Sequence, residues 1–268
     1  MTLNTHEIVQ RLKTIESLAL ATRVTSTNLL GKKIAAECIE NEIPLPSAML
    51  IARMQTAGRG RESRSWHSPS EKGIYATILH TRPLAELPLV PLAIGVIVAG
   101  FLRETYAIEA RIKWPNDIVV GRAKIAGTLI EARLREEAAA LIIGTGINIE
   151  PLGPDGPPNA TSVSEQARGR AVDVDSATVA FIEFLDAQLS RPFERDETLR
   201  QWRSLSTHAP GDALSCVVGG RSIEGRWQGI DEQGRAMIGQ GEETIFISAG
   251  DLMMVEPAAD EGVVKDEE

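Results

Sequence analysis

The chain has 268 residues and a formal net charge of −9, and 43% of its residues are hydrophobic. This length allows one sizeable core plus a small further domain, and the composition is typical of a globular protein. The acidic balance argues against a protein that binds nucleic acid over a broad basic surface. Two distant cysteines, Cys38 and Cys216, have no metal-ligand spacing and suit a reducing compartment, so we expect a cytoplasmic protein.

The sequence predicts neither a signal peptide nor a membrane-spanning segment. The N-terminus lacks a basic stretch followed by an apolar one, so we expect no signal peptide. The most apolar run, residues 87–102, contains Pro88 and Pro91 and is short for a membrane span. We expect a buried helix over residues 91–104 instead.

Helical and strand patterns are mixed through the first 208 residues. We expect helices over residues 5–16 and from about 28 to 38, the second capped by the hydroxyl residues at 25–27. Strands are expected over residues 17–22, 49–52 and 73–80, the last one preceding the buried helix. Four strands then follow at 110–114, 117–120, 124–133 and 138–149, with a tight turn at Gly121-Arg122. Helices over 176–189, capped by Ser176, and 195–206 complete this part.

Beyond Gly211 the pattern changes to short strands separated by glycine-rich turns, at 213–218, 222–230, 235–238 and 244–248. This pattern predicts a small antiparallel barrel. The segment 257–268 is acidic and poor in large apolar residues, so we expect a disordered tail. The expected fold is α+β: a domain 1–208 with a mixed sheet flanked by helices, then a β-barrel domain 209–256 and the tail.

A loop that alternates glycine and arginine follows the strand at 49–52. Glycine lets the backbone approach a ligand closely, and the arginine guanidinium binds carboxylate and phosphate oxygens. The pattern therefore predicts a loop that closes over a small anion, although a solvated basic loop or an RNA-binding segment is an alternative. The residues of interest are Gln55, Gly58, Arg59, Gly60, Arg61, Arg64 and Trp66.

Three further segments carry polar groups on the predicted strands. Trp114-Pro115-Asn116-Asp117 joins two strands and supplies an amide and a carboxylate. In Lys124-Ile125-Ala126-Gly127, strand alternation places Lys124 and Ala126 on one face, beside the room left at Gly127. The segment 143–149 has glycines at 144 and 146, which indicate close approach of a ligand, and Asn148 could pair with an adenine edge in bidentate fashion.

Taken together, these segments resemble the biotin protein ligases, whose motifs they match in order and spacing. The matching segments are Ser26-Thr27-Asn28, Gln55 with the Gly58–Arg61 loop and Trp66, Lys113–Asp117, Lys124–Gly127 and Gly144–Asn148. The resemblance implies a class-II aminoacyl-tRNA-synthetase-like catalytic domain followed by an SH3-like barrel. It also implies the activity: biotin and MgATP give biotinyl-5'-AMP, and a lysine of a biotin carboxyl carrier protein, that of acetyl-CoA carboxylase, takes the biotinyl group.

The resemblance also implies roles for individual residues. Catalytic roles fall to Arg61, Lys124 and Asp117, where Asp117 either orients the acceptor lysine or holds Mg²⁺, which otherwise binds through the ATP phosphates. The implied biotin site comprises Ser26, Thr27, Gln55, Gly58, Arg59, Arg61, Lys124, Gly127 and Gly144. The implied nucleotide site comprises Arg64, Trp66, Asn116, Gly146 and Asn148.

Several alternatives and departures remain at this point. A lipoate-protein ligase would share the fold and overall chemistry, a biotin-sensing DNA-binding regulator would lack ligase activity, and an SH3-like module could bind peptides. Only one short helix is expected before Ser26, so we expect a monofunctional ligase without a DNA-binding domain; homodimerisation is left open. Some members of the family place an arginine near the end of the chain, whereas residues 251–255 here contain no basic residue.

Overall fold

The computed structural model describes residues 3–218, 221–248 and 252–254. These residues fall into two compact units, one up to Thr207 together with Glu232–Gly234, and one from His208 to Asp231 that continues from Arg235. The expected tail over 257–268 lies outside the described residues.

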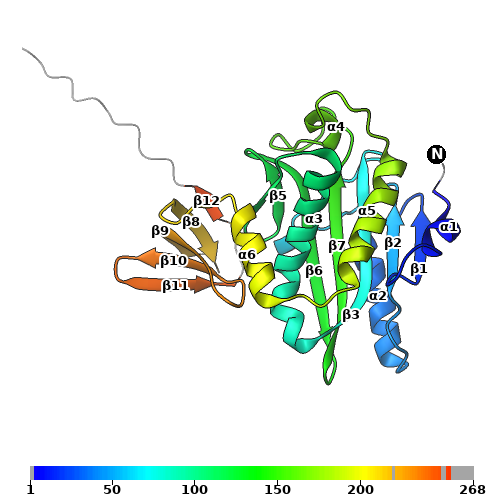
Figure 1. The fold of residues 1–268 in the computed structure, drawn as a ribbon, viewed down its shortest axis with the longest axis horizontal. Helices are drawn as coiled ribbons and strands as arrows, with labels where there is room; N and C mark the ends of the chain where they lie inside the picture. The colour runs from blue at the N-terminus through cyan, green and yellow to red at the C-terminus, as the bar shows by residue number, and fades with distance from the viewer. Residues whose placement is uncertain (1–2, 219–220, 249–251, 255–268) are drawn as a thin grey trace, which may run out of the picture. The chain divides into compact units, whose positions relative to one another are not determined.

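The first unit is built on a seven-stranded mixed sheet with the order β1-β2-β3-β7-β6-β5-β4 (Figure 1). All neighbouring strands are antiparallel except the parallel pair β1–β2. Every strand expected in this unit is present, with ends displaced by a few residues. The strands are β1 (Ser17–Ala21), β2 (Ala48–Ala52), β3 (Gly73–Pro83), β4 (Arg111–Lys113), β5 (Asp117–Val120), β6 (Ala123–Leu134) and β7 (Ala138–Asn148).

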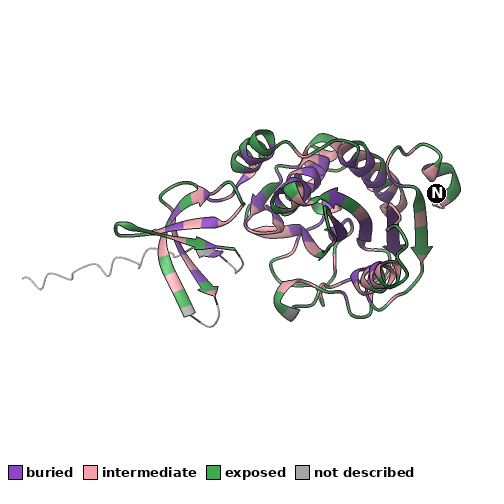
Figure 2. Ribbon diagram, turned by 90° about the horizontal axis from the view of Figure 1, so that it is seen from below, coloured by how far each residue is buried: buried purple, intermediate pink, exposed green. Residues whose placement is uncertain are grey.

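Helices cover both faces of this sheet (Figure 2). Helix α2 (Thr27–Glu40) packs on β2, β3 and β7, whereas α3 (Val90–Tyr106) packs on β4, β5 and β6 from the other side. Helices α5 (Val174–Leu189) and α6 (Arg195–Leu205) pack against α3. The short elements are α1 (Thr5–Val9), α4 (Val163–Gln166), and the 3₁₀ turns η1 (Arg61–Ser63) and η2 (Leu84–Leu89).

Helix α3 forms the core of this unit, as the apolar run predicted. Pro91 stands in its first turn, where a missing N–H costs nothing. The segment Leu84–Tyr106 is long and apolar enough to cross a membrane by length and composition, with a mean hydropathy of 2.1. In this fold it is a packed core helix: Val98, Phe101 and Leu102 are fully buried, and the Phe101 ring lies 5.2 Å from the Phe181 ring of α5.

Two helix boundaries differ from the predictions. Helix α1 ends early because the buried carboxylate of Asp186 accepts backbone N–H bonds from residues 13, 14 and 15 at 2.7–2.8 Å, which a continuing helix would have used internally. Ser176 is not the cap of α5. The helix begins at Val174, and Asp173 caps it by accepting the Ser176 N–H at 2.8 Å, a bond that also lowers the pKa of the Asp173 carboxyl.

The second unit is a five-stranded antiparallel sheet with the order β11-β10-β9-β8-β12. Its strands are β8 (Ala213–Val218), β9 (Arg221–Ile230), β10 (Ala236–Gln240), β11 (Glu243–Ile247) and β12 (Leu252–Met254). Trp227, Ile238 and Leu252 are among its buried residues, so the sheet has its own small core. The short strand β12 was not predicted, because the sequence pattern there lacks alternation.

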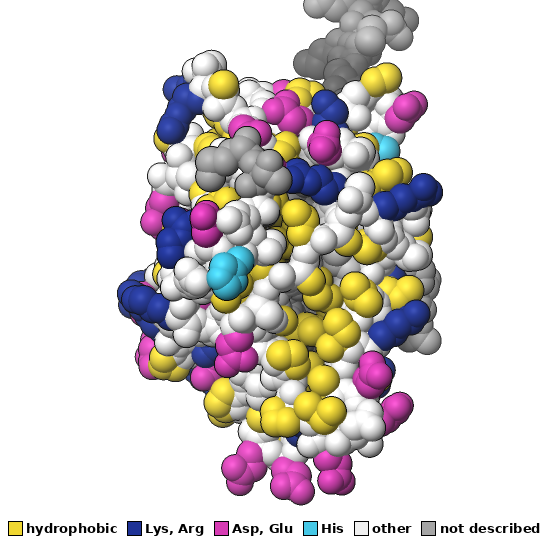
Figure 3. All heavy atoms as spheres, turned by 90° about the vertical axis from the view of Figure 1, so that its right-hand side faces the viewer, with side chains coloured by type: hydrophobic (Ala, Val, Ile, Leu, Met, Phe, Trp, Pro, Cys, Tyr) yellow, Lys and Arg dark blue, Asp and Glu magenta, His cyan; other side chains and the backbone are white. Residues whose placement is uncertain are grey.

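One side of the first unit exposes several large apolar side chains. Leu20 of β1, Leu30 of α2 and Ile43 after α2 are 37%, 39% and 52% exposed. The space-filling view of the corresponding side of the molecule shows hydrophobic side chains gathered between charged ones (Figure 3). Strand β1 is the edge of the sheet on this side.

Candidate functional site

Two glycines form a flat area on the face of the sheet that also carries α2. Gly127 of β6 pairs with Gly146 of β7, and Gly146 pairs in turn with Tyr75 of β3. The indole of Trp66 lies directly on this area. A Cβ at Gly146 would lie 2.3 Å from Trp66 Cε2, and one at Gly127 would lie 3.2 Å from Trp66 Cζ3. A group does pack closely on these glycines, as the sequence indicated, but here it is the Trp66 side chain and not a ligand.

Lys124 and Asp117 form an ion pair beside Trp66. Lys124 Nζ lies 2.6 Å from Asp117 Oδ1 and 5.1 Å from the centre of the Trp66 ring. The prediction that Lys124 shares a face with Ala126 is wrong. In the β5–β6 pairing, Ile118 is the partner of Ala126 and Val119 is the partner of Lys124, so the register shifts between them. This irregularity breaks the alternation of side chains along β6. Lys124 instead points to the side of Gly127, whose added Cβ would lie 3.1 Å from Lys124 Cε.

A pocket of about 330 Å³ opens beside this pair. It brings together the cations Lys113, Arg122 and Lys124 around the single carboxylate of Asp117. Lys113 is the strand neighbour of Asp117, and Arg122 lies in the turn between β5 and β6. Lys113 and Arg122 are not among the predicted site residues, although their closeness to Asp117 follows from the predicted hairpin. The complete lining is Ser65, Trp66, His67, Lys113, Asp117, Val119, Arg122, Lys124, Asn148, Leu152, Pro157, Asn159 and Ala160.

Buried polar atoms without a partner lie at this pocket. Asn148 is 2% exposed, and its Nδ2 donates to Thr161 O at 3.0 Å and to Lys124 O at 3.4 Å. Among the described residues, Asn148 Oδ1 and Trp66 Nε1 have no hydrogen-bond partner. The predicted bidentate role of Asn148 is therefore wrong, since only its oxygen remains. One free acceptor and one free donor are what a bound polar ligand would satisfy.

Two of the predicted biotin residues, Thr27 and Gln55, belong to a connected set of hydrogen bonds at the start of α2. Thr27 N–H donates to Gln55 Oε1 at 2.8 Å, and Gln55 Nε2 donates to Ser68 Oγ at 2.9 Å. Thr77 Oγ1 lies 2.9 Å from Thr27 Oγ1 and 2.6 Å from Asn28 Oδ1. Ser26 caps α2, accepting the N–H of residue 29 at 3.4 Å.

Two of the predicted site glycines make room for neighbouring groups of the protein itself. A Cβ at Gly144 would lie 2.0 Å from Asn28 Oδ1. A Cβ at Gly58 would lie 2.4 Å from Trp66 O. Both positions therefore need glycine to assemble the site, which is a different reason from the ligand contact that the sequence suggested.

The glycine–arginine loop folds back on itself as a small hairpin. Trp66 N–H donates to Gly58 O at 2.9 Å, and Gly60 N–H donates to Arg64 O at 2.7 Å. Arg64 also pairs with Glu62 at 3.4 Å. Within the described chain, none of the loop arginines (Arg59, Arg61, Arg64) lines the pocket described above, so their convergence with Lys124 stays a prediction.

Asn116, a predicted nucleotide-binding residue, uses its side chain within the protein. Its Nδ2 donates to Thr128 O at 2.6 Å, and Thr128 N–H donates back to Asn116 O at 3.1 Å. The amide thus fixes the turn before β5, which begins at Asp117. Asn116 is not part of the pocket lining. Its position supports that of Asp117.

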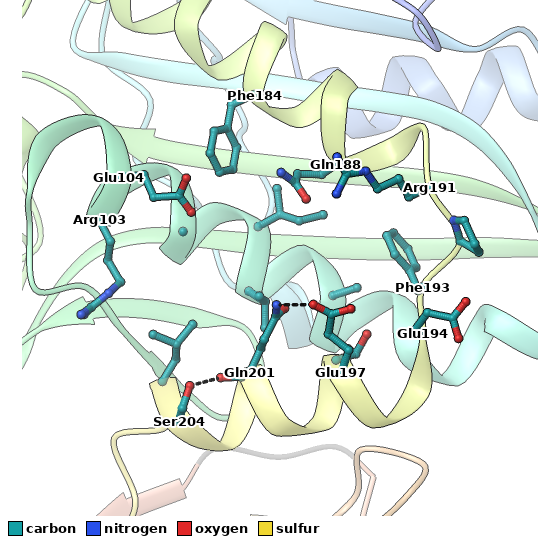
Figure 4. A pocket seen from close by; sticks show the side chains of 17 residues that line it. Arg103, Glu104, Phe184, Gln188, Arg191, Phe193, Glu194, Glu197, Gln201 and Ser204 are labelled. Carbon is teal, nitrogen blue, oxygen red and sulfur yellow. Dashed lines mark hydrogen bonds between the residues drawn. The ribbon is translucent and has the colours of Figure 1, made fainter.

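A second pocket, of about 340 Å³, lies between α3, α5 and α6 (Figure 4). Its lining mixes apolar residues such as Phe184 with the charged Arg103, Glu104 and Glu197, and Gln201 donates to Glu197 at 3.0 Å. It contains none of the predicted site residues. The chemistry indicated by the sequence therefore belongs to the glycine side of the sheet.

The donor set at the site does not form a metal cage. Among the described residues, no group of three or more His, Cys, Asp or Glu could hold a metal ion. Asp117 supplies a single carboxylate that is already paired with Lys124. A Mg²⁺ ion here would need most of its oxygen ligands from a bound phosphate group and from water.

The chain is similar in sequence to known proteins. Residues 20–148 match the sequence model of the biotin/lipoate A/B protein ligase family. The chain is 32% identical over 198 residues to the bifunctional ligase/repressor BirA of Escherichia coli, covering 71% of this chain and 61% of that protein. It is 30% identical over 209 residues to the biotin–[acetyl-CoA-carboxylase] ligase of Paracoccus denitrificans, covering 72% of this chain and 84% of that protein.

The fold is also similar to that of solved structures. The biotin protein ligase from Aquifex aeolicus, in complex with biotin and ATP, superimposes with a TM-score of 0.69 at 26% identity, covering 90% of this chain and 99% of that one. The matched family segment contains the Trp66 loop, the Lys124–Asp117 pair and both glycines of the flat area. From these matches and the site geometry, we conclude that the chain belongs to the biotin protein ligases of the biotin/lipoate A/B protein ligase family.

Proposed function

We propose that this protein activates biotin with ATP to form biotinyl-5'-AMP and then transfers the biotinyl group to a lysine of a carrier protein. The observation that carries the proposal is the Lys124–Asp117 pair, which lies beside Trp66 and the glycine area in a pocket with three cations. A site of this charge suits a ligand with several phosphates, and the aromatic ring on bare backbone suits a flat base or ring.

In the first step, the biotin carboxylate attacks the α-phosphorus of ATP and pyrophosphate leaves. Two anions must meet, so fixed positive charge lowers the barrier. Lys124 would stabilise the oxygens of the reacting phosphoryl group. Lys113 and Arg122 would hold the departing pyrophosphate, and Arg61 and Arg64 would approach when the loop closes.

The two ends of the intermediate would lie on either side of Lys124. The hydrogen-bond chain with Ser26, Thr27 and Gln55 would receive the ureido ring, with Arg59 helping to close the pocket. The adenine would lie near Trp66, where Asn148 Oδ1 can accept one N–H from its amino group. Gly127 and Gly146 would let Trp66 lie on the backbone beside the adenylate.

In the second step, the ε-amine of the acceptor lysine attacks the acyl carbon of the adenylate, and AMP leaves. A free lysine amine is protonated at neutral pH, with a pKa of about 10.4, and must lose its proton first. Asp117 is the only carboxylate in the pocket lining and would take up that proton once Lys124 turns toward the phosphate. Asp117 could instead contribute to Mg²⁺ binding with the ATP phosphates.

The partner we propose is the biotin carboxyl carrier protein of acetyl-CoA carboxylase, in keeping with the name of the Paracoccus denitrificans relative. We further propose that the enzyme acts in the cytoplasm and requires Mg²⁺. We expect no DNA binding by the described units, which a gel-shift measurement tests, and sedimentation of the protein with and without biotin and ATP tests homodimerisation.

ATP–pyrophosphate exchange tests the proposed activity. The wild-type protein is expected to exchange labelled pyrophosphate into ATP only when biotin is present, and lipoate should not replace biotin. Intact-mass measurement after incubation with ATP, biotin and a purified carrier domain should show one added biotinyl group. Exchange that depends on lipoate instead of biotin would assign the protein to the lipoate branch of the family and contradict the proposal.

A further inference from the structure

The pocket between α3, α5 and α6 has the size and the lining of a small-molecule site. Its volume of about 340 Å³ lies within the range of about 300–1,000 Å³ that is typical of such sites. Helices α5 and α6 both pack on α3, which forms the floor of the pocket (Figure 4). Helix α3 covers the face of the sheet opposite to α2, so this pocket is separate from the site that contains Lys124.

The floor of the pocket is one face of α3. It is lined by Ala93, Val96, Ile97 and Gly100, which follow the i, i+3, i+4, i+7 spacing of residues on a common helix face. Three of these residues have apolar side chains and the fourth has none, so the floor has no polar side-chain atom. An apolar group of a ligand would be removed from water on this floor, which is favourable.

A carboxylate and an aromatic ring meet at one end of the floor. A Cβ at Gly100 would lie 3.7 Å from both Glu104 Oε1 and Phe184 Cζ, so these two side chains flank the bare backbone. Arg103 points away from the pocket and pairs with Glu109 at 3.0 Å (Figure 4). Within the described ranges, no ion pair uses the Glu104 carboxylate. This end suits an ammonium group on an apolar chain, because a carboxylate binds it through a charge-assisted hydrogen bond.

A guanidinium group lies at the other end of the pocket. Figure 4 shows Arg191 and Phe193 on the side opposite to this carboxylate, and the Arg191 side chain extends toward Gln188. The buried Arg82 holds this segment: it donates to Arg191 O at 2.8 Å, and its guanidinium lies 4.5 Å from the centre of the Phe193 ring. Among the residues that the structure describes, no ion pair uses the Arg191 side chain. A guanidinium in this position suits a carboxylate.

The two charged ends are too far apart for a ligand that carries both charged groups on one carbon. Phe184 lies beside Gly100, whereas Gln188 and Arg191 follow Phe184 by four and seven residues. An α-helix rises about 1.5 Å per residue, so the two ends are about 6–10 Å apart. An extended chain of roughly five carbons between an ammonium and a carboxylate spans such a distance.

We infer that this pocket binds a small zwitterion, an ω-amino acid with an apolar chain. Its ammonium group would lie beside Glu104, its chain on the α3 floor and its carboxylate at Arg191. The other carboxylates of the lining do not oppose this arrangement. Glu197 already accepts the Gln201 amide at 3.0 Å, and Glu194 points away from the pocket (Figure 4). Such binding is separate from the proposed ligase activity.

Isothermal titration calorimetry of the full chain with 6-aminohexanoate tests the site. This probe carries both charges at the ends of a linear apolar chain and is expected to give saturable heat. Hexylamine and hexanoate each lack one of its charges and should bind about tenfold more weakly or worse, because one charge-assisted hydrogen bond is lost. Leucine, whose two charges share one carbon, should also bind more weakly than 6-aminohexanoate.

Two variants test the two ends of the pocket separately. Glu104→Gln and Arg191→Gln each remove one charge from an exposed side chain and should each raise the Kd for 6-aminohexanoate about tenfold. Glu37→Gln, the same loss of an exposed carboxylate on α2, is the matched control and should keep the wild-type Kd. All three variants should keep wild-type pyrophosphate exchange, because none of these residues lines the pocket of Lys124.

Three results would overturn the inference. The first is the absence of saturable heat with 6-aminohexanoate. The second is a Kd for hexylamine or hexanoate equal to that for 6-aminohexanoate, since one charged end would then contribute nothing. The third is a wild-type Kd in either Glu104→Gln or Arg191→Gln, provided that the thermal unfolding midpoint shows the variant to be folded.

Discussion

Strand β7 presents opposite chemistry to the two faces of the seven-stranded sheet. On one face lie Gly144, Gly146 and Asn148, which contact Asn28, Trp66 and the pocket. By strand alternation, Leu141, Ile143 and Ile147 point to the other face, where α3 and α5 pack, and all three are almost fully buried. Leu141, Ile143 and Ile147 therefore contribute to stability, whereas the glycines on the other face leave room for a ligand and for other side chains.

The largest effect is expected at the ion pair on the glycine face. Lys124→Ala removes the lysine that contacts both Asp117 and Trp66, and should lower the rate of adenylate formation by about 100-fold to 1,000-fold. Pyrophosphate exchange measures this rate. Lys33→Ala, on the exposed side of α2, serves as the control and should keep wild-type activity. Near-wild-type exchange in Lys124→Ala would remove this lysine from the mechanism.

On the opposite face, the half-buried imidazole of His80 should make the free energy of unfolding depend on pH. Burial lowers the pKa of His80 from 6.5 to about 4, helped by the nearby Arg82 charge and opposed by Asp186. Between these pH values the unfolded chain binds the proton and the folded protein does not. The stability is thus fully present above pH 6.5 and is lost as the pH falls to about 4.

The loss should be on the order of 3 kcal/mol. Urea unfolding at several pH values measures it, and the pH dependence should become flatter in His80→Gln. The His80 ring also bonds Ser47 Oγ at 3.1 Å, so a lower but still sloping curve in His80→Gln would mean that other groups cause the pH dependence.

A smaller effect on binding is expected at the glycine area itself. Gly146→Ala places a methyl group 2.3 Å from the resting position of Trp66 Cε2 and must displace the indole. The KM for ATP should rise about tenfold, while the midpoint of thermal unfolding changes little, because the displaced Trp66 is only half-buried. An unchanged KM for ATP would show that ATP binding does not depend on the position of Trp66 over Gly146.

The matched change on the packed face is Ile143→Val. It removes one methylene from a residue that is 1% exposed and should cost about 1 kcal/mol of unfolding free energy. Biotin and ATP KM values should remain at wild-type levels. Gly146→Ala and Ile143→Val together thus separate binding from stability within one strand. A changed KM in Ile143→Val would mean that the two faces are coupled.

The sequence predicts the fold of the first unit well because its strands and helices follow strong periodic patterns. The apolar runs of β7 and α3 depend only on local composition. The predictions fail where residues distant in the sequence determine the local structure. Asp186, more than 170 residues away, ends α1 by binding the backbone at residue 15. A bulge in the β5–β6 pairing turns Lys124 toward Gly127. Such features depend on tertiary packing and have no local signal.

The candidate site was predictable in part. The motif residues Trp66, Asp117, Lys124 and Asn148 do come together around one pocket. Lys113 and Arg122 were missed as site residues, although the predicted hairpin places them near Asp117. Thr77 was missed because its hydrogen bond to Asn28 joins residues far apart in the sequence and has no spacing rule. The loop arginines stay a prediction.

A crystal structure with biotin and a non-hydrolysable ATP analogue would test the location of the site most directly. We predict that the nucleotide lies beside Trp66 in the pocket with Lys124 and Asp117, with Lys124 Nζ within hydrogen-bond distance of the α-phosphate and the ureido ring near Thr27 and Gln55. Ligands bound in the pocket between α3, α5 and α6, or Lys124 still paired with Asp117 and turned away from the phosphates, would contradict this account.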